Sequence, residues 1–153
     1  MRRTKQAMGA MGFALATLFF MLLSNALAPA ARGASEPSGD SFYAIDGDTL
    51  VNRRTGQRYR LSNVDTPETG DRARCGAERT LGQHAARRTR ALVRSATRVD
   101  IRALGRNDSY GRSVAYILID GRDLGETLIA EGLARAWTGR RLPWCDAQGN
   151  LAR

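Results

Sequence analysis

Lysine is almost absent from this chain of 153 residues, because Lys5 is the only lysine among 24 basic residues. Residues 1–30 contain three of the basic residues and no acidic one, so residues 31–153 carry 21 arginines against 15 acidic side chains, a net charge of +6. Arginine presents a planar fork of donors that can hold a phosphate through two hydrogen bonds. This charge suits a polyanionic partner such as nucleic acid, although a genome-wide preference for arginine would give the same composition.

Long apolar runs are also scarce. The longest, Ala7–Leu23, is short for a membrane span, which needs about 20 residues. It is preceded by basic residues and followed by small residues that include an Ala-x-Ala site. This order predicts a secretory signal peptide in residues 1–30, cleaved after Ala30, with an uncleaved N-terminal anchor as the alternative. We therefore expect a periplasmic or secreted protein with no stable membrane insertion once the signal has been removed.

Histidine and cysteine are equally rare, since His84, Cys75 and Cys145 are the whole supply. Two sulfur atoms so far apart, with a single histidine, make a poor zinc site. In an oxidising compartment an isolated pair of cysteines favours a disulfide, which would stabilise the fold by about 4 kcal/mol in the chain-entropy model. Two buried thiols or a metal-binding pair are the alternatives. His84 is expected in the middle of a helix, partly buried or solvated, and not to be catalytic.

A small and polar stretch at residues 31–40 predicts a flexible leader, and short apolar runs separated by turn signals follow it. Asp46-Gly47 and Thr55-Gly56 are the clearest turn signals. Five strands are predicted: Phe42–Ile45, Thr49–Val51, Tyr59–Val64, Val99–Leu104 and Ser113–Ile119. The last is apolar on both faces and is expected to be buried.

The spacing of apolar residues predicts two helices. The first runs from near Cys75-Gly76 to near Ser95, and its expected buried face consists of Leu81, Ala85 and Leu92. The second begins at Asp123 as N-cap, with Glu126 at the spacing of a capping box. Its expected buried face consists of Leu124, Leu128, Ile129 and Leu133.

Five strands with a helix between the third and the fourth follow the order of an OB-fold barrel. The sequence therefore predicts an α+β fold in residues 41–153, a five-stranded OB-fold β-barrel with two packed helices. The arginine pairs Arg87-Arg88 and Arg140-Arg141 are expected on solvated faces or in weak contacts with a nucleic-acid backbone.

Acidic residues end two neighbouring strands of the predicted meander, within Asp46-Gly47-Asp48-Thr49 and Asp65-Thr66-Pro67-Glu68. The carboxylates of Asp48 and Asp65 can converge there, and two carboxylates with a backbone carbonyl and water suit calcium. Glu68 can take a proton from a water next to the metal or orient that water. Taken singly, each motif is more typical of a turn than of a metal site, and a glutamate is more typical of a solvated loop.

Arg60 and Arg112 are the candidate cations for binding a phosphate. Arg60 lies in the strand that leads to Asp65, and Arg112 follows Gly111, which allows an unusual backbone turn beside a strand start. Two guanidinium groups can clamp the negative charge that builds up on a phosphate during phosphodiester cleavage. The alternative is that both are ordinary surface charges.

Three motifs in one order, Asp-Gly-Asp-Thr, Arg-x4-Asp-Thr-Pro-Glu and Asp-x-Tyr-Gly-Arg, closely resemble the staphylococcal nuclease (thermonuclease) family, in a short exported form. The resemblance covers about Phe42 to Trp137. It implies a calcium-dependent endonuclease, a phosphodiesterase that hydrolyses DNA and RNA without sequence specificity and leaves 3′-phosphorylated products. A non-catalytic OB module that binds nucleic acid is the alternative, but such modules usually lack some of these charged residues.

The resemblance also implies roles for single residues. Asp48 and Asp65 would bind Ca2+ through their side chains and Thr66 through its backbone carbonyl, and Glu68 would be the general base or orient the attacking water. The remaining roles concern the phosphates of the substrate. Arg60 and Arg112 would hold the scissile phosphate and stabilise the transition state, and Tyr110 would bind a phosphate near the end of the substrate.

The chain departs from the secreted members of that family at three places. Ser109 stands where those members have a lysine, and their base-stacking tyrosines are missing, although Trp137 or Trp144 can substitute. The third C-terminal helix is expected to be missing or reduced. We expect a Cys75–Cys145 bond to tie the tail to the start of the first helix and to replace part of that stabilisation. A monomer is expected.

Overall fold

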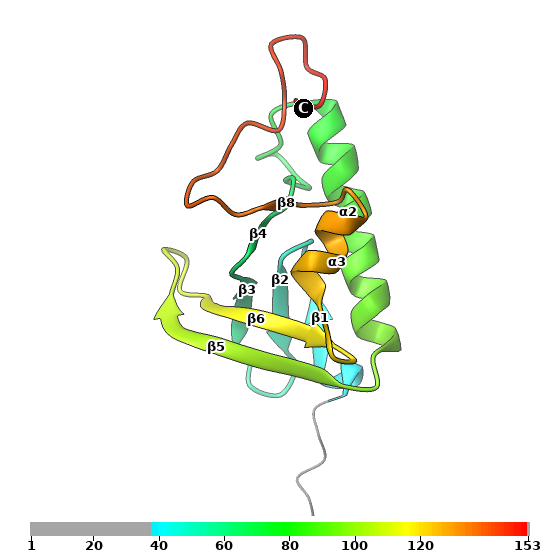
Figure 1. Cartoon of the computed structure of the whole chain (residues 1–153), viewed down its shortest axis with the longest axis vertical. Helices are drawn as coiled ribbons and strands as arrows, with labels where there is room; N and C mark the ends of the chain where they lie inside the picture. The colour runs from blue at the N-terminus through cyan, green and yellow to red at the C-terminus, as the bar shows by residue number, and fades with distance from the viewer. Residues whose placement is uncertain (1–37, 153) are drawn as a thin grey trace, which may run out of the picture. The chain divides into compact units, whose positions relative to one another are not determined.

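The computed structural model describes residues 38–152 (Figure 1). The predicted signal peptide and most of the predicted leader lie outside the described residues. A short 3₁₀ helix, η1 (Gly39–Ser41), leads into the first strand. Among residues 38–152 no helix is long and apolar enough to cross a membrane.

The main sheet is mixed and has the strand order β1-β2-β3-β6-β5, with β7 added to β6. Its strands are β1 (Phe42–Ala44), β2 (Thr49–Asn52), β3 (Arg58–Leu61), β5 (Val99–Asn107), β6 (Ser113–Ile119) and β7 (Arg122–Asp123). All neighbours are antiparallel except β3 and β6, which run parallel with Arg60 opposite Val114. This parallel pair joins segments from distant parts of the sequence, and it brings the strand of Arg60 beside the strand that follows Arg112.

The predicted third strand is wrong at its end, because the chain leaves the main sheet after Leu61. Residues Val64–Asp65 form a separate strand, β4, which pairs with β8 (Arg135–Ala136). The break falls at Ser62-Asn63, where the Asn63 side chain donates to the capping carboxylate of Asp123 at 3.0 Å. The sheet is therefore six strands plus a two-stranded ribbon and not the five strands predicted. The α+β OB-fold arrangement itself is confirmed.

Helix α2 (Gly76–Ser95) has the predicted bounds, but of the predicted buried face only Ala85 is fully buried. Its innermost residues are mainly small ones: Gly82, Ala85, Ala86, Thr89 and Val93. A Cβ on Gly82 would lie 2.5 Å from the Glu68 carbonyl oxygen, so the helix backbone packs directly on that loop. Leu81 and Leu92 are only half-buried because close packing of backbone on backbone leaves no space for leucine.

Helix α3 (Leu124–Ala130) begins as predicted, since the Asp123 carboxylate accepts from the Glu126 amide at 2.8 Å. It ends at Ala130, and Gly132, whose φ is 70°, turns the chain so that the Leu133 amide donates to the Leu128 carbonyl at 2.8 Å. Its apolar face joins Leu50, Leu61, Val64 and Ile117 in one core under the sheet.

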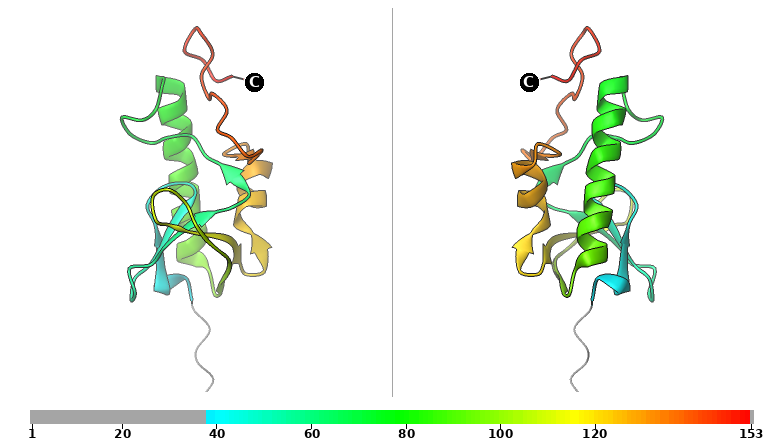
Figure 2. Two further views of the ribbon diagram at one scale, coloured as in Figure 1. Left: turned by 90° about the vertical axis from the view of Figure 1, so that its left-hand side faces the viewer. Right: turned by 90° about the vertical axis from the view of Figure 1, so that its right-hand side faces the viewer.

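The segment after β8 contains no further helix within the described residues. Figures 1 and 2 show it passing the β4–β8 ribbon toward the end of the domain where α2 begins. There Cys145 forms a disulfide with Cys75, the N-cap residue of α2. Residues 137–145 are thus held beside the loop that follows β4.

Candidate active site

A cleft of about 370 Å³ lies between the end of β3, the loop after β4 and the β5–β6 turn. The side chains predicted for catalysis, metal binding and substrate binding all line it: Asp48, Arg60, Asp65, Thr66, Glu68, Tyr110 and Arg112. They come from segments far apart in the sequence, which the β3–β6 pairing and the loop after β4 bring to one place.

Asp48 is the buried centre of this cleft, with 7% of its surface exposed. Its Oδ2 accepts from Thr66 Oγ1 at 2.7 Å and lies 3.2 Å from Arg60 Nη2. Its Oδ1 accepts from Thr49 Oγ1 at 3.1 Å and lies 3.7 Å from Arg112 Nη1. The two predicted phosphate-binding arginines therefore face one carboxylate, from its two oxygens.

Both guanidinium groups also donate hydrogen bonds to groups other than Asp48. Arg60 donates to the carbonyls of Leu61 and Val64, the second at 2.9 Å. Arg112 donates through Nε to Asp108 at 2.7 Å and through Nη1 to Thr49 Oγ1 at 2.7 Å. With these partners their positions are fixed before any ligand arrives, which reduces the entropy lost on binding.

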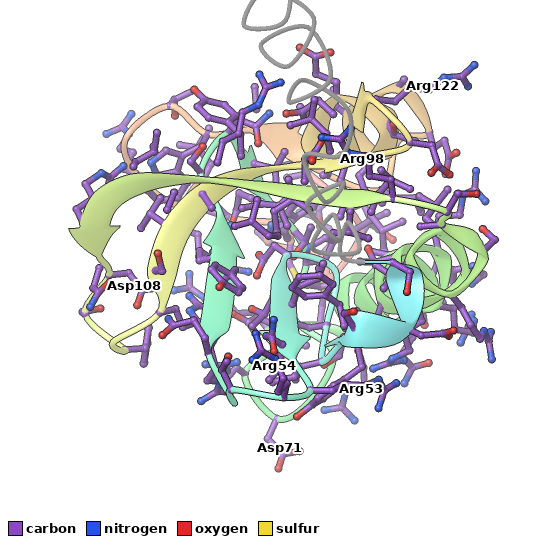
Figure 3. The ribbon with its side chains drawn as sticks, turned by 90° about the horizontal axis from the view of Figure 1, so that it is seen from below. Arg53, Arg54, Asp71, Arg98, Asp108 and Arg122 are labelled. Atoms are coloured by element: carbon purple, nitrogen blue, oxygen red, sulfur yellow. A yellow bond between two sulfur atoms is a disulfide. The ribbon has the colours of Figure 1, made fainter. Side chains whose placement is uncertain are left out.

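The β5–β6 turn presents Tyr110 to solvent beside Arg112. Asp108, labelled in Figure 3, accepts from the amides of Tyr110 and Arg112 at 2.9 and 3.0 Å, and Gly111 has a φ of 74°. Partial burial alone would raise the pKa of Asp108, but the hydrogen bonds donated by Arg112 and Tyr110 outweigh it and hold the pKa below its usual value. The Tyr110 ring lies 5.4 Å from the Arg112 guanidinium and is 70% exposed.

Several acidic residues surround Arg141, which we expected on a solvated face. Arg141 lies 3.2 Å from Asp65 Oδ1 and 3.0 Å from Glu68 Oε1 through Nη1. Its Nη2 donates to the Thr66 carbonyl at 3.1 Å and lies 3.4 Å from Glu78 Oε1. Arg141 is exposed as expected, but its guanidinium also joins the predicted metal ligands Asp65 and Thr66 to the predicted base Glu68.

Asp65 is 4% exposed, and its Oδ2 accepts from the indole nitrogen of Trp144 at 2.9 Å. Its Oδ1 accepts no hydrogen bond and is met only by the charge of Arg141. Burial raises the pKa of Asp65, in spite of the positive charges of Arg141 and Arg60 and the Trp144 bond. A buried carboxylate with one free oxygen favours a further cationic partner in the cleft.

Asp46 lines the cleft, and Glu78 lies next to the loop that carries Glu68. Burial raises the pKa of Asp46, and the negative charge of Asp48 raises it further. Glu78 is 2% exposed in the first turn of α2 and accepts from the amides of Glu68 and Arg74 at 3.3 and 2.8 Å. It therefore fixes the loop that carries Glu68.

The predicted ligand set fits a hard cation by its chemistry. Asp48, Asp65 and the Thr66 carbonyl provide the oxygen donors that calcium prefers, and Asp65 Oδ1 has an unused lone pair. Within the described residues, no group of three or more His, Cys, Asp or Glu side chains is arranged to hold a metal. In this structure guanidinium groups meet both carboxylates.

Three residues that contact the acids of the cleft were given no such role from the sequence: Glu78, Arg141 and Trp144. Trp144 was considered for base stacking, but only 3% of its surface is exposed, whereas Trp137 is 40% exposed and lines the cleft. The Cys145 next to Trp144 was the available signal, since a bond to Cys75 places this tail beside the acids.

The curled mixed sheet with an acid- and arginine-lined cleft belongs to the class of OB-type folds. The family model described as "Staphylococcal nuclease homologue" matches residues 58–148. The chain is 40% identical over 95 residues to endonuclease YncB of Bacillus subtilis (strain 168), covering 60% of this chain and 44% of that protein. It is 31% identical over 132 residues to the thermonuclease of Staphylococcus intermedius, covering 82% of this chain and 76% of that protein.

A third relative, the SPbeta prophage-derived endonuclease YokF of Bacillus subtilis (strain 168), is 39% identical over 97 residues, which are 60% of this chain and 31% of that protein. The chain thus spans less than half the length of its two Bacillus relatives. It belongs to the staphylococcal nuclease homologue family.

Proposed function

We propose that this protein is a calcium-dependent nuclease that hydrolyses DNA and RNA without sequence specificity and leaves 3′-phosphorylated products. The observation that carries the proposal is the convergence of Asp48, Asp65 and Glu68 with Arg60 and Arg112 in one cleft. Membership of the family and similarity to proteins named endonuclease and thermonuclease support it.

The two arginines are the proposed clamp for the scissile phosphate. Their guanidinium nitrogens lie 3.2 and 3.7 Å from the two oxygens of Asp48, so both can reach one phosphate placed beside that carboxylate. Charge-assisted hydrogen bonds from two preorganised guanidinium groups stabilise the transition state more than the ground state, because negative charge increases on the phosphorus oxygens.

Calcium, when bound by Asp48, Asp65 and the Thr66 carbonyl, would neutralise phosphate charge and help position water. Glu68 then accepts the proton of the attacking water as the bond to the 5′ oxygen breaks. Its carboxylate lines the cleft, is 22% exposed and has ionic partners in Arg72 at 3.2 Å and Arg141 at 3.0 Å. These contacts hold the Glu68 carboxylate at the edge of the cleft.

Side chains at the mouth of the cleft are the proposed contacts to neighbouring nucleotides. Tyr110 binds a phosphate near the end of the substrate, and Trp137 stacks on a base. Arg106 lines the same cleft from the end of β5 and provides a cation close to Ser109. Readout of base edges has no part in this proposal, so binding follows the backbone and not the sequence.

Export and a monomeric state complete the proposal. The basic start and the apolar run of the sequence support export, and the Cys75–Cys145 disulfide is consistent with an oxidising compartment. Sequencing the N-terminus of the protein recovered outside the cytoplasm would test the cleavage after Ala30. Light scattering of the purified protein would test the monomer.

Digestion of plasmid DNA and of RNA in a metal series tests the proposed activity. The wild type should cut both with Ca2+, and a chelator should abolish cutting. Glu68→Gln should lower the rate at least about 100-fold, the scale of a lost general base. Glu126→Gln, an exposed change on α3, is the matched control and should cut normally.

The alternative, a non-catalytic nucleic-acid-binding module, predicts a different result. Such a protein would bind single-stranded DNA tightly in a mobility-shift assay and leave the plasmid intact at every metal concentration. Cutting that survives both the chelator and Glu68→Gln would instead point to a contaminant.

A further inference from the structure

Arg141 occupies the place where the predicted metal ligands meet. One nitrogen of its guanidinium lies 3.2 Å from Asp65 Oδ1, and the other donates to the Thr66 carbonyl at 3.1 Å. These are two of the three groups assigned to the cation in the proposed function. The same guanidinium contacts Glu68 at 3.0 Å, so it also contacts the proposed base.

A divalent cation and this guanidinium compete for those oxygens. A calcium ligand lies within about 2.3–2.6 Å of the ion, and both partners approach the same oxygen of Asp65. Positive charge on both adds repulsion at short range. Each therefore weakens the binding of the other.

We propose that Arg141 is an intramolecular competitor for the divalent cation and sets the cation concentration at which the site fills; this inference rests on the proposed function. Without a cation, Arg141 neutralises the buried Asp65 together with Glu68 and Glu78. With a cation, its side chain swings out of the cleft.

The surroundings of Arg141 fit this exchange. Its side chain is 39% exposed, so it has a direct path to solvent. The segment that carries it is anchored four residues later by the Cys75–Cys145 bond and three residues later by Trp144, whose indole donates to Asp65. These two anchors keep the guanidinium at a high effective concentration next to the acids. Loss of the anchors should therefore weaken the competition.

The size of the effect follows from the fraction of molecules in which Arg141 is out. The apparent dissociation constant equals the intrinsic constant divided by that fraction. If about one molecule in ten has Arg141 out, its removal should strengthen cation binding about tenfold.

The experiment is a titration of the purified full chain with Tb3+, a luminescent stand-in for Ca2+ that Trp144 beside Asp65 can sensitise. Isothermal titration with Ca2+ repeats it without a probe. Arg141→Ala should bind both ions about tenfold more tightly than the wild type. Arg140→Ala removes the same charge from the exposed neighbouring residue and should change the affinity by less than about threefold, because a charge exposed to solvent is screened by salt.

Arg141→Lys is the second variant. It keeps the positive charge, but the single ammonium nitrogen of lysine cannot contact as many oxygens at once as the planar guanidinium does. Its affinity should lie between those of the wild type and Arg141→Ala. Equal or weaker binding by both Arg141 variants overturns the inference alone, with the proposed function intact. Absence of Tb3+ and Ca2+ binding in every protein overturns the inference and the proposed metal site together.

Discussion

At the scale of residues, Asp48 organises the cleft by facing a guanidinium group with each of its oxygens. Arg60 is a strand residue tied to backbone carbonyls, and Arg112 is tied to Asp108 and Thr49. The fork of arginine is what allows Arg112 to contact an acid and a hydroxyl and still face the cleft.

Arg112→Lys tests the importance of the fork. Lysine keeps the charge but loses the contacts made through Nε and Nη1, so we expect kcat to fall at least about 100-fold with the fold intact. Arg102→Lys in the exposed part of β5 is the matched control. Retention of more than half of the activity by Arg112→Lys would show that charge alone suffices.

Asp108 provides the pH prediction. Its folded pKa is lowered, so it stabilises the fold above the ordinary aspartate pKa, and this contribution is lost as pH falls through the lowered value. Asp108→Asn should cost about 1 kcal/mol of unfolding free energy at pH 7, and the difference from wild type should shrink in acid. Urea unfolding at several pH values measures it. Asp71→Asn, on an exposed loop residue labelled in Figure 3, should show no such pH-dependent difference.

At the scale of elements, the position of Glu68 depends on how closely α2 packs on the loop after β4. Gly82 allows this contact, and the buried Glu78 of the same helix accepts from the Glu68 amide at 3.3 Å. The Thr89 hydroxyl donates to the Gly47 carbonyl at 2.9 Å, which fixes the turn that carries Asp48. One face of one helix thus aligns both acidic loops.

Gly82→Ala should therefore disturb both stability and activity. The new Cβ meets backbone at 2.5 Å, which cannot move as a side chain can, so we expect a loss of about 1–3 kcal/mol. Gly76→Ala is the matched control, because a Cβ there meets nothing within 4 Å and alanine is the better helix former. If chemical unfolding of the two variants gives equal free energies, the close packing seen at Gly82 has no energetic weight.

How far the sequence predicts this molecule depends on how local each interaction is. The first turn of α3 was predictable because Asp123 and the Glu126 amide are close in the chain. The buried face of α2 was predicted only at Ala85, since apolar character favours leucine while close backbone packing requires glycine and alanine. Arg141 was missed for a similar reason: its partners lie up to 76 positions away and only the folded tail brings them near.

At the scale of the whole molecule, the Cys75–Cys145 disulfide joins two residues 70 positions apart and closes the tail on the start of α2. From the sequence, we expected this bond to replace part of the stabilisation that a third C-terminal helix provides in secreted members of the family. The tail it holds buries Trp144, with the Arg135 guanidinium 3.9 Å from the ring centroid.

Removing the disulfide should lower the melting temperature by roughly 10 °C, because a loop of this length is worth about 4 kcal/mol in the chain-entropy model. Calorimetry of the Cys75→Ser/Cys145→Ser variant measures the change, and reduction of the wild type with a thiol should reproduce it. An unchanged melting temperature in both would mean that the tail adds nothing to stability.

The parallel pairing of β3 with β6 determines when the proposed nuclease site forms, because it brings the two arginines together. Arg60 and Arg112 become neighbours only when these strands pair, because α2 and β5 lie between them in the sequence. A newly made chain that stays unfolded for export would lack the site that binds a phosphodiester. Under the proposed function, the producing cell would then need no separate inhibitor to protect its own chromosome and messages before secretion is complete.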